Sequence, residues 1–128
     1  MEDKKLAFAF WEVKGESYKC KLKTTGVIEL ENKYNRSLLS IISGEMPSLT
    51  VMLQIMHTAI KPWNHSISIN DMYNLFDAYT EDNGSQIEFY TGPFMEMCKV
   101  SGFFPQKLNQ ENSQENSQED NPEESREE

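Results

Sequence analysis

Two cysteines and two histidines are the side chains in this 128-residue sequence whose types could support nucleophilic or metal chemistry. Cys20 with His57 could in principle join a thiol nucleophile to a base. An activated thiolate needs a positive, partly exposed setting. Lys19 and Lys21 flank Cys20, but along a strand they point to the opposite face. We therefore expect no catalytic residue, and the protein is not expected to be an enzyme.

The spacing of the histidines, cysteines, acids and glycines matches no metal-binding or cofactor-binding motif. His57 and His65 are separated by a proline and lie far from both cysteines, which does not match the short, defined spacings of a metal site. The string Asp82–Gly84 suggests a calcium-binding loop. When Gly84 is aligned with the glycine at the sixth position of that loop, Tyr79 and Tyr90 fall at the first and twelfth positions, where acidic ligands are required. A tight turn explains that string. The glycines are too dispersed for a phosphate-binding loop, so no metal or cofactor is expected.

The charge of the chain is uneven. The formal net charge is −9. Residues 106–128 contain eight acids and two bases, net −6, so the preceding residues carry −3. The one basic cluster comprises Lys14, Lys19, Lys21 and Lys23, which we interpret as a solvated strand face. Nucleic-acid binding requires clustered bases, so this balance argues against a nucleic-acid partner.

The cysteines and the apolar segments indicate the compartment. Cys20 and Cys98 have no CxxC partner, and the N-terminus lacks the long apolar core of a signal peptide. The apolar run from Leu6 to Val13 is too short to cross a bilayer. We expect a cytosolic protein with two buried thiols and no membrane partner.

A change in composition divides the chain. Residues 1–105 have the composition of one folded domain. Residues 106–128 are of low complexity: residues 109–119 nearly repeat a Gln-Glu-Asn-Ser unit, and Leu108 is the one strongly apolar residue between Lys107 and Glu128. Such a segment cannot bury enough surface to offset the entropy of ordering, so a disordered acidic C-terminal tail is predicted.

Hydrophobic periodicity predicts an α+β fold, mainly α, with an N-terminal β-hairpin followed by about five short helices. The hairpin spans residues 6–22, with its turn at residues 14–17. It places Leu6, Phe8 and Phe10 on one face and Ala7, Ala9 and Trp11 on the other. The predicted helices begin at Thr24 or Thr25, Ser37, Ser48, Asn70 and about Ser85, and they end at Tyr34, before Gly44, before Pro62, at Tyr79 and at Val100. Gly92-Pro93 should kink or split the last helix, and Gly102 should cap it.

Large apolar side chains are the remaining candidates for function. Aromatic residues are enriched at the centres of interfaces, and methionine adapts to variable partners. Core packing is the alternative for the methionine stripe, for Trp11 and for the Phe103-Phe104 pair, whereas Trp63 lies in a Pro-Trp-Asn-His loop and should be exposed. The candidate partner-binding residues are Trp11, Leu53, Met56, Trp63, Phe103 and Phe104.

The order of these elements and several short strings resemble a known family. The strings are the hairpin at 8–22, Thr-Thr-Gly-Val-Ile-Glu-Leu-Glu-Asn-Lys at 24–33, Met-Pro-Ser-Leu at 46–49 with Leu-Gln-Ile-Met-His at 53–57, Asp-Met-Tyr-Asn-Leu-Phe-Asp-Ala-Tyr at 71–79, and Val-Ser-Gly-Phe-Phe at 100–104. Over roughly residues 5–104 the chain resembles the tail assembly chaperones of long-tailed bacteriophages and prophages.

The resemblance implies a function. Members of that family coat the tape measure protein, keep it soluble, promote assembly of the tail tube in the host cytoplasm and are absent from the mature virion. The chain would be the short, non-frameshifted form, and a longer frameshifted form would contact the tail tube protein. Self-association is also implied, and an unpaired hairpin edge is a physical candidate for it. The alternatives are a structural head–tail or tail component retained in the virion and an acidic DNA mimic.

Overall fold

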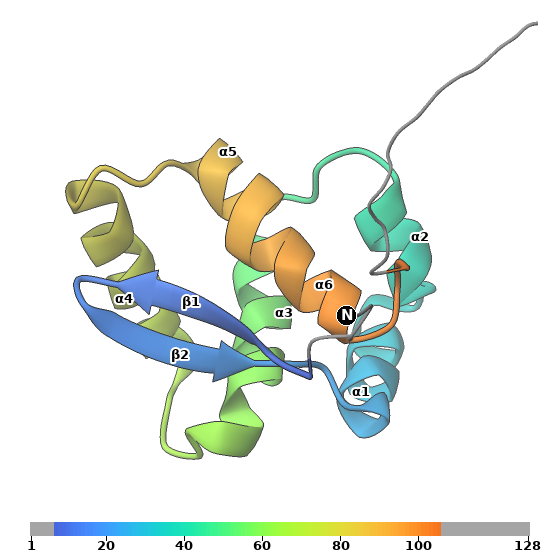
Figure 1. Ribbon diagram of the computed structural model, residues 1–128. Coiled ribbons are helices and arrows are strands. Elements are labelled where there is room, and N and C mark those ends of the chain that lie inside the picture. Colours follow the sequence, from blue (N-terminus) through green and yellow to red (C-terminus); the bar gives the residue numbers. More distant parts are fainter. Residues whose placement is uncertain (1–6, 106–128) are drawn as a thin grey trace, which may run out of the picture.

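The computed structural model describes residues 7–105, which form a two-stranded hairpin and a set of short helices (Figure 1). The predicted fold class, α+β and mainly α, is confirmed. The predicted disorder of residues 106–128 lies outside the described residues. In chain order the elements are β1 (Ala9–Val13), β2 (Glu16–Cys20), α1 (Thr24–Tyr34), α2 (Leu38–Ser43), α3 (Leu49–Ile60), the 3-10 turn η1 (Lys61–Trp63), α4 (Ile69–Glu81), α5 (Gln86–Phe89), the π-helical segment η2 (Tyr90–Phe94) and α6 (Met95–Val100).

The hairpin turns more tightly than predicted. Lys14 and Gly15 form the whole turn, whereas a turn over residues 14–17 was expected; both have positive φ, of 48° and 85°. Two positive values in succession match the right-handed twist of the flanking strands. The turn sets an antiparallel register in which Trp11 lies opposite Tyr18, so Trp11 and its neighbours on that face point into the core.

Serine hydroxyls cap the starts of four helices, α2, α3, α4 and α5. Ser37 and Ser48 accept hydrogen bonds from the backbone N–H groups three residues later, at 3.2 Å in each case, as predicted. The predicted start of α4 at Asn70 is wrong. Ser68 caps this helix, and Ser68 and Asp71 exchange side-chain-to-backbone hydrogen bonds of 3.0 and 2.9 Å. This capping box satisfies two backbone donors, which moves the start of the helix toward the N-terminus.

Three further predictions concern the start of α1, the proline in the last helical stretch and the glycine that follows it. The predicted threonine cap of α1 is wrong: Thr24 is already the first helical residue, and Lys23 holds the N-cap position without a side-chain hydrogen bond. Gly92-Pro93 divides the last helical stretch, as predicted: both residues lie in the π-helical segment η2, which separates α5 from α6. Gly102 has φ of +96°, and the Phe103 N–H donates to the Cys98 carbonyl at 3.1 Å. This C-terminal cap at Gly102 was predicted.

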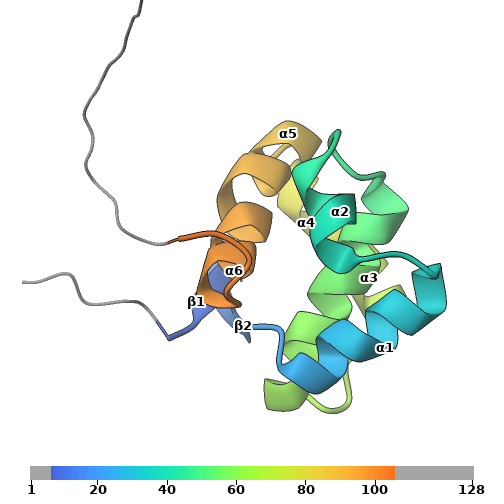
Figure 2. The same cartoon turned by 90° about the vertical axis from the view of Figure 1, so that its right-hand side faces the viewer.

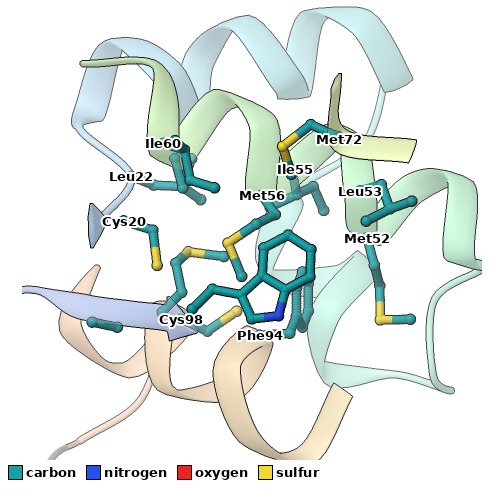
Figure 3. Packing of buried hydrophobic residues seen from close by; sticks show 14 of the residues in the cluster. Cys20, Leu22, Met52, Leu53, Ile55, Met56, Ile60, Met72, Phe94 and Cys98 are labelled. Atoms are coloured by element: carbon teal, nitrogen blue, oxygen red, sulfur yellow. The ribbon is translucent and has the colours of Figure 1, made fainter. Parts of the chain in front are cut away.

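Helix α3 is central to the core, where it contacts β2, α1, α4 and η2. Its buried side chains fill the space between these elements (Figure 3), and they include Met52, Leu53, Ile55, Met56, Ala59 and Ile60. Two hydrogen bonds fix the end of the hairpin on the helices. The Lys21 N–H donates to the Ala59 carbonyl at 3.1 Å, and the Leu22 N–H donates to Ser101 Oγ at 2.8 Å.

Candidate partner-binding surface

Three of the six predicted partner-binding side chains are buried. Trp11 and Met56 are fully buried, and Leu53 is 3% exposed. Trp11 packs against Phe89 with ring centroids 4.9 Å apart. In this fold a partner cannot reach these three side chains, so their assignment to a partner surface is wrong. The periodic positions of α3 face the core because other elements surround that helix.

The other three predicted residues are accessible to different degrees. Phe103 and Phe104 are half-buried and pack against the core after the cap at Gly102. Trp63 is 36% exposed at the end of η1. Pro62 and the 3-10 geometry turn the chain away from α3, which leaves this indole at the surface as predicted.

Trp63 has an aromatic neighbour that the sequence analysis did not single out. Phe8, which immediately precedes β1, meets its ring edge to face with centroids 5.1 Å apart. Phe8 belongs to the hairpin face opposite Trp11, and Phe10 on that same face is 48% exposed. The outward face of the hairpin therefore carries aromatic side chains instead of a uniformly polar surface.

Three lysine ammonium groups lie over this aromatic pair. Lys19 Nζ is 4.5 Å from the centroid of the Phe8 ring and 5.8 Å from that of Trp63. Lys21 Nζ lies 5.7 Å from Phe8, and Lys23 Nζ lies 5.7 Å from Trp63. Cations at these distances are attracted to the ring faces. We name these five residues the aromatic–lysine patch.

The four lysines of the expected solvated face all reach the surface, and three of them also contact aromatic rings. Lys14 is separate from the patch and pairs with Glu81 at 3.5 Å, the one ion pair within residues 7–105. Glu12, a carboxylate of the same hairpin, accepts a hydrogen bond from Ser17 at 3.2 Å. The patch is therefore a local positive surface on an acidic chain.

A cleft of about 360 Å³ continues the surface beyond Lys23, between α1 and η1. The charged side chains of its lining are Lys23, Lys61 and Glu29, and His57 and His65 also line it. His57 Nε2 lies 2.9 Å from the Ile67 carbonyl oxygen, which holds that ring in place. The cleft thus continues the surface from the patch toward α1, with Lys61 and Glu29 as its additional charged groups.

The geometry of the thiols is unfavourable for nucleophilic chemistry. Cys20 and Cys98 are fully buried, and burial raises the pKa of each thiol from 9.0 to about 12. The negative charge of Glu96 raises the pKa of Cys20 further, and the charge of a Cys20 thiolate raises the pKa of Cys98 further. Protonated thiols of this kind are poor nucleophiles. Lys19 and Lys21 lie on the opposite face from Cys20, as predicted.

No helix within residues 7–105 is long and apolar enough to span a bilayer. No group of three or more His, Cys, Asp or Glu side chains in that range could hold a metal ion. Comparison with known proteins found no matching family model, no matching curated protein and no matching solved structure.

Proposed function

We propose that this protein is a non-enzymatic tail assembly chaperone of a long-tailed phage or prophage. It binds the tape measure protein in the host cytoplasm, keeps that protein soluble, promotes tail tube assembly and is absent from the mature virion. The observation that carries the binding function is the surface pair of the exposed Trp63 and the half-buried Phe8, with its three lysines. The identity of the partner rests on the resemblance of the sequence strings.

The chemistry of the patch suits a helical partner with an apolar stripe and flanking acids. Aromatic side chains commonly supply the binding energy of an interface, and the Trp63 and Phe8 rings offer two such anchors side by side. Lysine side chains cover apolar surface with their stems while their ammonium groups meet carboxylates. An amphipathic helix laid along the hairpin face would use both contacts.

Of the alternatives, an acidic DNA mimic agrees poorly with the patch. A mimic presents carboxylates spaced like phosphates, whereas Lys19, Lys21 and Lys23 gather on one face of the described residues. A structural component retained in the virion would use the same protein-binding surface. Its presence in purified particles distinguishes it from a chaperone, which is released before the particle matures.

Co-expression with the candidate tape measure protein encoded downstream tests the proposal. We expect a soluble co-complex with many copies of this chain per partner, measured by co-purification and sizing. A tape measure protein that stays insoluble while this chain purifies alone would overturn the proposed function. The tail tube protein should join the complex through the longer frameshifted form.

A further inference from the structure

The positive charge of the aromatic–lysine patch lacks a carboxylate partner within residues 7–105. The one ion pair of that range uses Lys14 and Glu81. Glu12, a carboxylate of the same hairpin, accepts a hydrogen bond from Ser17, and Glu29 lies in the neighbouring cleft. Three ammonium groups around the exposed Trp63 ring and the half-buried Phe8 ring form a surface that attracts an acidic peptide with little need for apolar anchors.

The same chain contains a peptide of that chemistry. Residues 106–128 contain eight acids against two bases, net −6, whereas residues 7–105 carry −3 from eleven acids and eight bases. The acids begin at Glu111 and recur every few positions to Glu128. Carboxylates spread along a segment in this way can meet several lysines in more than one alignment.

The described chain ends close to the lysines. Ser101 Oγ accepts a hydrogen bond from the Leu22 N–H at 2.8 Å, and Leu22 lies between Lys21 and Lys23 in the sequence. Pro105 follows four residues later, and the two ends of the described chain lie at the same side of the molecule in Figure 2. Glu111 is six residues further on, and an extended chain of that length spans at most about 20 Å. The acids are therefore within reach of the patch.

We propose that residues 106–128 bind the aromatic–lysine patch of their own chain. The contact is electrostatic, so its strength falls as salt screens the charges. It does not depend on the identity of the proposed partner, because both components belong to this chain. If that partner also uses Phe8 and Trp63, the acidic segment competes with it and leaves the patch when the partner binds.

A nitroxide spin label on the full chain tests this contact. Ser117→Cys places one reactive thiol in the acidic segment. The two native thiols are fully buried, with pKa raised to about 12, so they should not take up the label. Paramagnetic broadening of nuclear magnetic resonance signals then reports which residues the segment approaches. No partner protein is needed, so failure here is distinct from failure of the proposed function.

The expected result is local and sensitive to salt. The amide signals of Lys19, Lys21 and Lys23 and the Trp63 indole signal should lose intensity roughly twofold or more at low salt. They should recover at about 1 M salt, where the Debye length is about 3 Å. Signals from Ile87, an exposed residue of α5, should keep their intensity.

Two triple variants separate the patch from general charge attraction. Lys19→Gln/Lys21→Gln/Lys23→Gln should abolish the broadening. The matched variant Lys14→Gln/Lys33→Gln/Arg36→Gln removes the same charge elsewhere and should leave the broadening unchanged.

The proposal would be overturned if the spin label caused no broadening, or if both triple variants lost the broadening equally. It would also be overturned if, in a mixed sample, isotope-labelled chains were broadened only by spin-labelled neighbouring chains, because the contact would then be between chains. A fourth contrary result is a patch that does not bind the acidic segment but whose signals shift when a short poly-dT strand is added.

Discussion

The ring of Phe8 meets the ring of Trp63 edge to face, with centroids 5.1 Å apart, and this contact joins the start of the hairpin to the turn after α3. Neither residue alone makes an aromatic surface. The pair does so because the Lys21 N–H bonds to the Ala59 carbonyl, which holds the hairpin against the C-terminal part of α3. The proposed binding surface is therefore a tertiary feature, and its integrity depends on the packing beneath it.

Leu53→Asp should unfold the protein. Leu53 is 3% exposed on α3, so the change removes buried apolar contacts and places an unpaired carboxylate in the core. We expect a loss of at least about 4 kcal/mol in the free energy of unfolding. Circular dichroism and urea denaturation measure it. Leu53→Met conserves the volume and should cost less than about 1.5 kcal/mol; a folded, stable aspartate variant would contradict the buried position.

Ser101→Ala should destabilise the junction between the hairpin and α6. The Ser101 hydroxyl accepts from the Leu22 N–H at 2.8 Å and donates to the Met97 carbonyl at 2.7 Å. Its loss leaves a part-buried N–H without its acceptor, at a cost of about 1–3 kcal/mol. Urea denaturation measures the change. Ser43→Ala, at an exposed position of α2, should stay within about 0.5 kcal/mol of the parent. Equal effects of the two changes would contradict the bond.

Lys14→Asn should stabilise the hairpin. Lys14 has φ of 48°, a region that asparagine tolerates better than lysine, and Asn-Gly is the favoured pair in this kind of turn. The change gives up the Lys14–Glu81 pair, which is solvent-exposed and contributes little. We expect a gain of about 0.5 kcal/mol in unfolding experiments. The control Glu81→Gln removes the ion pair alone and so measures its contribution to stability. A Lys14→Asn protein that is less stable than the parent would contradict the positive φ of residue 14 in this turn.

The buried thiols should make stability fall in alkaline solution. An unfolded thiol loses its proton near the ordinary value of 9.0, whereas the folded thiols keep theirs until pH approaches a pKa of about 12. The unfolded state therefore binds fewer protons above pH 9, and unfolding becomes easier as pH rises through that window. The urea midpoint at pH 8 and at pH 9.5 measures this fall.

A double variant isolates the thiol contribution. Cys20→Ala/Cys98→Ala should show a smaller change in the urea midpoint between those two pH values. Burial also raises the pKa of Tyr34 from 10.0, but that group titrates mainly above the window. An unchanged pH dependence in the double variant would assign the effect to other groups.

Local chemistry made the secondary structure largely predictable. Ser37 and Ser48 cap their helices as predicted. A serine hydroxyl can accept a hydrogen bond from the backbone N–H three residues later, and this local contact does not depend on the tertiary packing around the helix. The start of α4 was predicted two residues late. Ser68 forms a reciprocal pair with Asp71, and Asn70 was the nearer polar residue to the apolar run.

The binding surface was less predictable, because strand alternation defines two faces without saying which one the helices cover. Phe8 and Trp11 were placed on opposite faces, and packing against Phe89 and Tyr79 decided that Trp11 is the inner one. Trp63 could be recognised from its proline-containing loop. The contact between Phe8 and Trp63 depends on how the hairpin meets α3, which short-range patterns do not contain.

The most direct measurement is the amount of tape measure protein kept in the soluble fraction by Trp63→Ala. Trp63 is an exposed member of the aromatic–lysine patch, so its loss should remove a binding anchor without unfolding the domain. We expect at least about a fivefold drop, corresponding to about 1 kcal/mol of binding energy. Ile87→Ala, which truncates an exposed apolar side chain on α5, should keep the partner as soluble as the parent does. A folded Trp63→Ala protein that solubilises the partner fully would contradict the account.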